Sequence, residues 1–287
     1  MQKKRILYWV TIALLSLVIL VCAVMIGHKL ITDAQQRNIY SELLETMPSV
    51  ERPPIPTGTE PSGDATSPSE TEPVETQPQE TEPEEIPTLL DPVTGKPVLY
   101  PYMTLYTTNN DMVGFIDIPG TDIRYPVLQT KDEPNYYLNR NFYKQWAACG
   151  AIYVREACDV NDPSDNVTLY GHRMIDGSMF SDLHLYKREK FFKNNRYIHF
   201  DTLTEYHTYE IFAVFQTEAN HLGSFNYHLF DDAANEEEFD RFVSKCKELA
   251  YYDTGITPKF GDKLITLSTC DRSIEDGRLV VVARRVM

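Results

Sequence analysis

The chain has 287 residues, and its 42 acidic residues outnumber the 27 basic ones to give a formal net charge of −15. This acidic balance excludes the extended basic surface by which proteins bind nucleic acids, so we expect no nucleic-acid partner. The five cysteines, an odd number without regular spacing, argue against a disulfide-stapled scaffold.

The chain begins with a candidate transmembrane helix at residues 6–28. Residues 6–26 contain no charged side chain, and at about 1.5 Å per residue such a helix crosses the roughly 30 Å hydrocarbon layer of a bilayer. A cleaved signal peptide would have a shorter apolar region and a cleavage site with small residues, and lipidation at Cys22 would require a small residue before it, where Val21 stands. Three basic residues come before residue 6, and such flanks stay in the cytoplasm. We therefore expect a cytoplasmic tail at residues 1–5, a single pass in the cell membrane, and an extracellular remainder.

Two further segments are expected before the globular part. Residues 29–50 include Ile39, Leu43 and Leu44 at helical spacing, which predicts a juxtamembrane helical segment. Residues 51–95 are rich in Pro, Thr, Ser and Glu, and the triplet Thr-Glu-Pro recurs three times. Such a composition buries too little apolar surface to offset chain entropy. It predicts an extended, disordered linker that acts as a stalk.

Residues 96–287 are predicted to form one mainly-β domain with a few helices. The strand candidates, separated by Gly, Pro, Asn and Asp clusters, fit a barrel or a sandwich. One helix is expected at residues 178–186, with Ser178 as its cap, and another at 236–250, whose apolar stripe makes Cys246 a core residue. The sequence leaves open whether Cys149 and Cys158 pair. The expected strands are residues 113–118, 123–128, 150–154, 167–170, 197–200, 206–216, 263–269 and 278–284.

Cys270 is the candidate nucleophile, because it ends an alternating strand and is followed by Asp271 and Arg272, where we expect a polar loop. A thiol at a strand end can face a cleft, although a free cysteine taken alone is more often an inert core residue. Its standing depends on partners. The segment 166–170 is another strand, followed by Gly171 and His172, and a glycine permits a close backbone approach there.

His172 and Arg278 are the candidate partners of the thiol. An imidazole exchanges protons with a thiol at physiological pH, since their ordinary pKa values are near 6.5 and 8.5. Arg278 opens the next strand, so a hairpin after Cys270 brings it back beside the thiol, where a cation can stabilise an oxyanion. The alternatives are a turn histidine, an edge arginine in solvent, and Arg272 as a rival cation. Arg284 and Arg285 lie at the far end of the same strand.

These residues resemble the sortase family, whose signature is a Thr-Leu-x-Thr-Cys strand, a distant histidine after a strand, and an arginine on the next strand. The match covers residues 111–286, and the segments 170–174 and 176–183 make it most similar to class B. The resemblance implies a closed barrel with a helix at 236–250 between its sixth and seventh strands. It further implies that Cys270 is the nucleophile, His172 the general acid and base, and Arg278 the oxyanion and substrate stabiliser.

The activity implied by this resemblance is that of a cysteine transpeptidase. The thiol would cleave a C-terminal sorting motif of secreted proteins after its threonine, and a thioacyl enzyme would pass the protein to an amine of peptidoglycan or its lipid-linked precursor. Neither a cofactor nor a metal is implied. The substrate contacts carried over are Ser268, Tyr227 and Leu138. The asparagine that class B members often have four residues before the leucine is replaced by Pro134, for which Asn135 can substitute, or the pocket differs.

Three alternatives remain at the level of sequence. A pilus-polymerising sortase usually has a second, C-terminal membrane span, whereas this sequence stops at Met287 soon after the last strand. An L,D-transpeptidase also uses Cys, His and Arg, but its nucleophile follows His-Gly. A non-catalytic extracellular adhesion or binding domain on a membrane stalk would share the anchor and the linker, and only the set of Cys270, His172 and Arg278 separates it from the enzyme.

Overall fold

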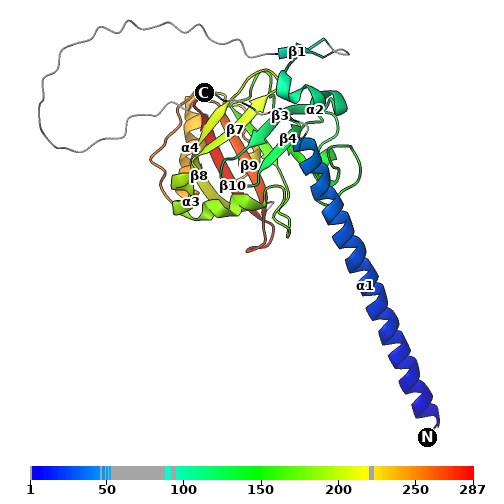
Figure 1. Cartoon of the computed structure of the whole chain (residues 1–287). Coiled ribbons are helices and arrows are strands. Elements are labelled where there is room, and N and C mark those ends of the chain that lie inside the picture. Colours follow the sequence, from blue (N-terminus) through cyan, green and yellow to red (C-terminus); the bar gives the residue numbers. More distant parts are fainter. Residues whose placement is uncertain are drawn as a thin grey trace, which may run out of the picture.

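The computed structural model describes residues 2–45, 47, 48, 50, 52, 88–91, 95–219 and 223–287. Its centre is a closed eight-stranded β-barrel, from which one long helix extends (Figure 1). The mainly-β barrel predicted from the sequence is therefore confirmed. The helices, with η marking a 3₁₀ helix, are α1 (Gln2–Glu45), η1 (Tyr100–Tyr102), α2 (Met103–Thr108), η2 (Tyr136–Asn139), η3 (Ser181–Lys187), α3 (Glu189–Asn194), η4 (Tyr227–Leu229) and α4 (Glu236–Leu249).

All eight segments predicted as strands are strands of the barrel. Around the barrel they follow the order β10-β8-β7-β3-β4-β5-β6-β9. Neighbours are antiparallel except for two parallel pairs, β4 with β5 and β6 with β9. The barrel strands are β3 (Met112–Asp117), β4 (Arg124–Leu128), β5 (Ile152–Val154), β6 (Asn166–Tyr170), β7 (Tyr197–Thr202), β8 (Thr208–Glu218), β9 (Leu264–Asp271) and β10 (Gly277–Arg285).

The register of three strands brings their chemically important ends to one rim of the barrel. Because β6 and β9 are parallel, with Tyr170 opposite Ser268, both strands end at the same edge. The turn after β9 returns the chain antiparallel, and Arg278 of β10 lies opposite Cys270. The hairpin predicted from the spacing of Cys270 and Arg278 is present.

The barrel wall separates two apolar layers. Along β10, Leu279 and Val281 join the interior cluster, whereas Val280 and Val282 join an outer cluster under α4, as the period-two alternation of a strand requires. Cys246 of α4 is fully buried in the outer cluster, which confirms it as a core residue. Within the described residues no disulfide links any two cysteines, so those at positions 149 and 158 do not pair.

The two predicted helices of the domain have different outcomes. α4 is confirmed, and the side chain of Asn235 caps its first turn by accepting a hydrogen bond from the Glu238 N–H at 3.1 Å. The helix expected at 178–186 is wrong in type and start, because η3 is a 3₁₀ helix that begins at Ser181. Met179 has a φ of 58°, a left-handed conformation that no right-handed helix contains. The helical turn therefore starts only after it.

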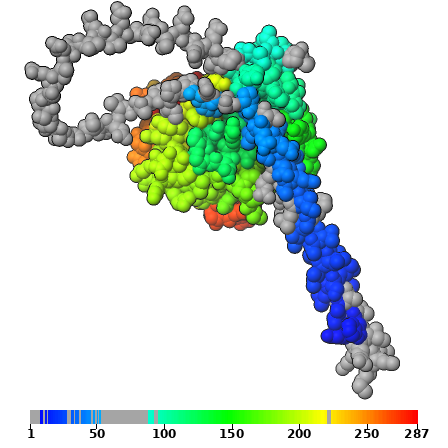
Figure 2. All heavy atoms as spheres, viewed as in Figure 1, coloured from blue at the N-terminus to red at the C-terminus, as the bar shows by residue number. Residues whose placement is uncertain are grey.

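The segment predicted as a separate juxtamembrane helix is the C-terminal part of α1, and it is packed on the barrel. Tyr40 and Leu43 are only 5% and 6% exposed. The Tyr40 ring meets the Tyr125 ring edge to face, with centroids 5.3 Å apart, and Gln36 Oε1 accepts a hydrogen bond from Asn141 at 2.9 Å. Figure 2 shows this end of the blue helix against the barrel. The helix end thus belongs to the folded domain.

The N-terminal part of α1 extends away from the barrel (Figure 1). Its described apolar side chains are exposed, among them Leu14, Ile19 and Val24. In the part of the chain that the structure describes, no helix is long and apolar enough to cross a membrane. The transmembrane helix expected at residues 6–28 therefore has no support from the structure.

The linker expected at residues 51–95 falls mostly outside the described residues. Its described end differs from the prediction, because β1 (Thr88–Leu90) pairs with β2 (Pro97–Leu99) in an antiparallel hairpin. The Leu99 N–H donates to the Leu203 carbonyl at 2.7 Å, and Val98 and Leu99 are fully buried. The apolar side chains of β2 are buried, and β1 pairs with it. The described end of the expected linker is therefore a strand.

Arg52 ties the chain just after α1 to the barrel. Its two terminal nitrogens donate to the two carboxylate oxygens of Asp201 on β7, each at 2.7 Å. Asp201 also accepts from the Tyr102 hydroxyl and from the His207 N–H at 3.2 Å. The Asp201 side chain is fully buried, and that of Arg52 is 15% exposed. Arg52 thus holds the chain just after α1 on the barrel.

We expect Arg52→Ala to lower the free energy of unfolding by about 3–5 kcal/mol, because it leaves a buried carboxylate without its cation. The control is Lys131→Ala, which removes an exposed ion pair with Asp159 at 2.8 Å and should cost at most about 1 kcal/mol. Urea unfolding of the two variants measures the difference. Equal midpoints for the two variants would show that Asp201 tolerates burial without Arg52.

Candidate active site

A pocket of about 230 Å³ opens at the barrel rim where β6, β9 and β10 meet. It brings together the three residues singled out for chemistry and two of the three expected substrate contacts. The remaining lining is a set of polar and aromatic side chains from β5, β6 and the loop before η2. The lining residues are Asn135, Leu138, Tyr153, Tyr170, Gly171, His172, Ser268, Thr269, Cys270 and Arg278.

Cys270 is half-buried at the end of β9 and faces this pocket. Its backbone carbonyl lies 3.3 Å from His184 Nε2 of η3, and because a carbonyl only accepts, that nitrogen is the donor. Burial lowers the pKa of His184, although its bond to the Cys270 carbonyl opposes this. The imidazole of His184 thus helps to fix the backbone beneath the thiol.

The polar loop expected directly after Cys270 begins one residue later. Asp271 is still in β9 and only 2% exposed. Although burial opposes it, hydrogen bonds from Lys187 and Ser273 hold the pKa of Asp271 below its ordinary value. An ion pair with Lys187 makes burial of this carboxylate tolerable. The strand end is therefore anchored from η3 at two successive residues.

His172 follows β6 and is oriented by a backbone acceptor. Its Nε2 lies 2.8 Å from the Leu138 carbonyl oxygen, so Nε2 carries a proton and donates it there. The position just before it, Gly171, has no room for a side chain, because a Cβ would collide with Ile152 and Phe180. The close approach expected at this glycine is confirmed. The second ring nitrogen, Nδ1, is the one left for proton exchange.

Arg278 is half-buried on β10 directly across from Cys270. Its Nη1 donates to the carbonyls of Gly277 at 3.0 Å and Asp276 at 3.3 Å, which orients the guanidinium while Nε and Nη2 retain three N–H donors. The rivals lie elsewhere. Arg272 is exposed and donates to the Arg173 carbonyl at 3.5 Å. Arg284, at the opposite end of β10, pairs with Glu210 at 3.3 Å.

The three expected substrate contacts are not equivalent in the structure. Ser268 and Leu138 line the pocket, and Leu138 is 38% exposed. Tyr227 was expected at the rim, but it is 4% exposed and absent from the lining. Its hydroxyl shares a hydrogen bond of 2.6 Å with the Ser268 hydroxyl. Tyr227 therefore supports Ser268 from behind instead of facing the pocket.

Two tyrosines that the sequence reasoning missed form the pocket wall beside the thiol. Tyr153 of β5 and Tyr170 of β6 are directly opposite one another in the sheet, with ring centroids 5.4 Å apart. Burial raises the pKa of both hydroxyls, so both stay protonated at neutral pH. The available signal was the alternation in residues 150–154 and the position of Tyr170 just before Gly171.

The sequence left open whether Asn135 takes the place of the asparagine that Pro134 replaces. The structure places Asn135 in the lining of the pocket. Its Oδ1 accepts a hydrogen bond from the Tyr153 hydroxyl at 3.0 Å. Its φ is 60°, a left-handed conformation that asparagine tolerates better than most residues. The pocket thus has an asparagine three residues before Leu138 instead of four.

As for metal ligands, no group of three or more His, Cys, Asp or Glu side chains is placed to hold an ion among the described residues.

Comparison with known proteins gives one consistent result. A family model described as a sortase domain matches residues 116–286. Sortase B of Listeria monocytogenes is 35% identical over 186 residues, which is 63% of this chain and 72% of that protein. The structure of a Staphylococcus aureus sortase B-substrate complex aligns with a TM-score of 0.60 at 28% identity, covering 66% of this chain and 86% of that one. A sortase B complexed with triglycine aligns with a TM-score of 0.59 at 28% identity, covering 64% and 85%.

Proposed function

This chain belongs to the sortase family, in its class B, whose members are cysteine transpeptidases, and on that premise we propose that it transfers proteins bearing a C-terminal sorting motif to a cell-wall amine. The observation that carries the proposal is the rim pocket in which Cys270, His172 and Arg278 meet. A thiol, an imidazole and a guanidinium in one pocket supply the nucleophile, the proton carrier and the oxyanion partner that acyl transfer needs.

In the first half-reaction the Cys270 thiol gives its proton to His172 Nδ1, and the resulting thiolate attacks the carbonyl carbon of the threonine in the motif. The new C–S bond places a negative charge on the carbonyl oxygen, and the Arg278 guanidinium, oriented by the turn before it, stabilises that charge. The peptide C–N bond then breaks. The departing amine takes a proton from His172 Nδ1, because Nε2 is bonded to the Leu138 carbonyl. The product is a thioacyl enzyme.

In the second half-reaction an amine resolves the thioacyl enzyme. Its nitrogen attacks the same carbonyl carbon, His172 removes the proton, and the C–S bond breaks to restore the thiolate. The relatives described above were solved with a substrate and with triglycine, which favours a short amine-terminated peptide as the acceptor. For this chain we propose an amine of peptidoglycan or of its lipid-linked precursor.

We also propose that the enzyme is attached to the cell membrane, with its catalytic domain outside. The support is the sequence, in which residues 6–26 carry no charge after three basic residues. The exposed apolar side chains of α1, such as Leu14 and Ile19, agree with a lipid environment. Fractionation of cells expressing the chain tests this proposal, and release of the protein by salt alone would contradict it.

A peptide library that varies every position around a threonine tests the proposed activity. The fragment used begins at Thr32, because one beginning at residue 97 loses the buried contacts of Tyr40, Leu43 and Arg52. We expect a thioacyl adduct, seen by intact mass, with a subset of the peptides. If no peptide forms an adduct with a folded fragment, the transpeptidase proposal fails and a non-catalytic adhesion domain takes its place.

Arg278→Lys separates charge from geometry at the oxyanion position. Lysine keeps the charge but loses the planar fork that can donate to the oxyanion while it is oriented by Gly277. We expect kcat/KM to fall by about 10²-fold, the typical loss for one oxyanion donor. The control is Arg272→Lys, which changes an exposed cation of the same loop. Full activity of Arg278→Lys combined with a loss in Arg272→Lys would move the role to Arg272.

A further inference from the structure

His172 is held by two segments of the chain, one at its side chain and one at its backbone. The side chain donates to the Leu138 carbonyl at 2.8 Å, and the backbone carbonyl accepts from the Phe180 N–H at 2.9 Å. An isolated bridge between Arg173 and Met179 closes the loop between these contacts. The position of the imidazole therefore depends on the placement of both segments.

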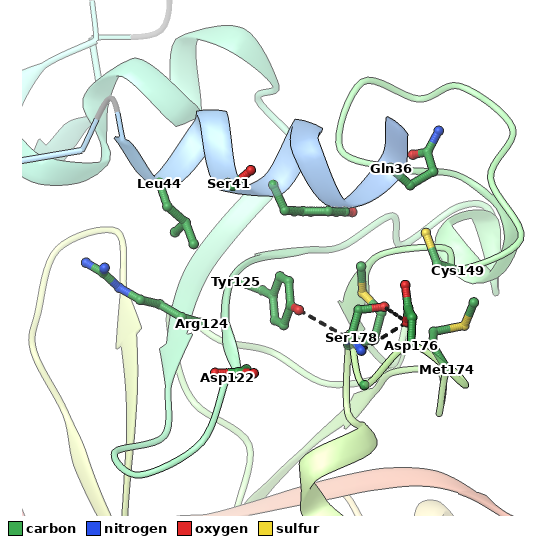
Figure 3. Close-up of a pocket in the computed structure, with 13 residues that line it drawn as sticks. Gln36, Ser41, Leu44, Asp122, Arg124, Tyr125, Cys149, Met174, Asp176 and Ser178 are labelled. Carbon is green, nitrogen blue, oxygen red and sulfur yellow. Dashed lines mark hydrogen bonds between the residues drawn. The ribbon is translucent and has the colours of Figure 1, made fainter. Parts of the chain in front are cut away.

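Met179, at the end of the loop that carries His172, is held in an unfavourable conformation by one hydrogen bond. It is 2% exposed and has a φ of 58°, which a residue with a side chain rarely adopts. Its N–H donates to the Tyr125 hydroxyl of β4 at 3.0 Å, drawn as a dashed line in Figure 3. Burial raises the pKa of Tyr125 to about 12, so this hydroxyl stays neutral near neutral pH.

Tyr40 of α1 contacts a neighbour of each segment, Tyr125 for one and Gly150 for the other. Its ring packs edge to face on the Tyr125 ring, with centroids 5.3 Å apart, and so presses on the residue that holds Met179. Its hydroxyl donates to the Gly150 carbonyl at 3.2 Å. Gly150 in turn lies so close to the Leu138 carbonyl that a Cβ on it would collide with that oxygen. Tyr40 thus packs against Tyr125, which holds the segment bonded to the His172 backbone. It also bonds to Gly150, which lies beside the Leu138 carbonyl that accepts from the His172 ring.

A cavity of about 300 Å³ lies between α1 and the barrel at this point, lined by Tyr40, Tyr125, Met174, Asp176 and Met179 among others. Figure 3 shows α1 above the cavity and the loop of Met174, Asp176 and Ser178 across from it. The loop is held at its Met174 end by the Ser181 hydroxyl, which accepts a hydrogen bond from the Met174 N–H at 2.8 Å. Its Met179 end is held from the barrel wall by the Tyr125 hydroxyl.

We propose that Tyr40 and Tyr125 are positioning residues for His172, so that docking of α1 on the barrel sets the geometry of the catalytic imidazole 132 positions further along the chain. The inference deepens the proposed function and rests on it for the role of His172. It assigns to the end of α1 a task in turnover beyond attachment of the domain.

Three variants of the full chain test whether Tyr40 and Tyr125 position His172. Tyr125→Phe removes the acceptor for Met179, Tyr40→Ala removes both contacts of Tyr40, and Tyr40→Phe keeps the ring contact while losing the bond to Gly150. We expect kcat to fall by about 10- to 100-fold in the first two, the cost of misplacing a catalytic group by up to about 1 Å. KM should stay unchanged in Tyr125→Phe, which leaves the Leu138 side of the pocket in place, and Tyr40→Phe should recover part of the loss seen in Tyr40→Ala.

The matched control is Leu43→Ala, which opens a hole in the same helix contact, since Leu43 is 6% exposed, but leaves the ring contact of Tyr40 with Tyr125 and its hydrogen bond to Gly150 in place. It should lower the melting temperature and leave kcat unchanged. A second readout is independent of turnover. With ¹³C-labelled histidine, the Cε1 signal of His172, assigned among seven histidines by its loss in His172→Gln, should move in Tyr125→Phe and Tyr40→Ala but not in Leu43→Ala.

Two results would overturn the proposal that Tyr40 and Tyr125 position His172. One is a kcat loss in Leu43→Ala as large as that in Tyr40→Ala, which would mean general loosening of the domain. The other is an unmoved His172 signal in Tyr125→Phe. If no peptide acylates Cys270 of the wild-type chain, the proposed function fails. The His172 signal would still show whether Tyr40 and Tyr125 position the imidazole.

Discussion

Cys270→Ala is expected to abolish the thioacyl enzyme and to lower turnover by at least about 10³-fold, because the atom that bonds to the substrate is removed. The residue is half-buried at a strand end and lines the rim pocket, so alanine fits without displacing the strand. Intact mass spectrometry after incubation with a reactive library peptide measures the adduct. The fold is checked by an unchanged unfolding midpoint.

Cys246→Ala is the control for Cys270→Ala. Its thiol is fully buried under α4, and burial raises its pKa well above the ordinary value, so it has neither access nor thiolate character. The variant should lose some stability through a small cavity and keep the adduct. An adduct that persists in Cys270→Ala and disappears in Cys246→Ala would contradict the assignment of the nucleophile.

His172→Gln is expected to lower kcat by about 10²- to 10⁴-fold, the usual contribution of a general acid and base. Glutamine keeps an N–H that can donate to the Leu138 carbonyl, as His172 Nε2 does at 2.8 Å, but it cannot exchange a proton. Rapid-quench measurements should show both acylation and release by the amine slowed. Both steps fall because the same nitrogen gives the proton in one and takes it in the other.

His184→Gln is the matched control for His172→Gln. His184 also has its Nε2 on a backbone carbonyl, that of Cys270 at 3.3 Å, yet it does not line the pocket. Its amide replacement keeps that donor, so only a small loss of kcat is expected. If His184→Gln were the more damaging variant, His184 and not His172 would be the proton carrier.

The strands were predictable because each carries its own signal. Short runs of strand-forming residues bounded by turn residues mark β3 to β10, and the hairpin from Cys270 to Arg278 follows from eight residues of spacing. The helix expected at 178–186 failed because Met179 takes a left-handed conformation, which depends on a hydroxyl from β4 and not on local propensity. The prediction of a loop at Asp271 was wrong, because an ion pair with Lys187 compensates its buried carboxylate. Local sequence reasoning takes that carboxylate as exposed.

The site was predictable in its chemistry and not in its supports. Cys270, His172 and Arg278 stand at strand ends beside recognisable motifs, so their residue types and spacing point to acyl transfer before any fold is known. The placement of Tyr227 behind Ser268 and the contribution of Tyr153 to the wall depend on which strands are neighbours around the barrel. No local pattern contains that order.

The sequence by itself thus determined the strands and the three residues proposed for the chemistry, because both follow from short-range patterns. Tertiary structure decided what those residues rest on. Tyr40 bonds to Gly150 across 110 positions, and Arg52 bonds to Asp201 across 149, contacts that leave no periodic trace in the chain. The end of α1 and Arg52 therefore belong to the catalytic domain, because burial of an aromatic ring and a paired charge holds them on the barrel.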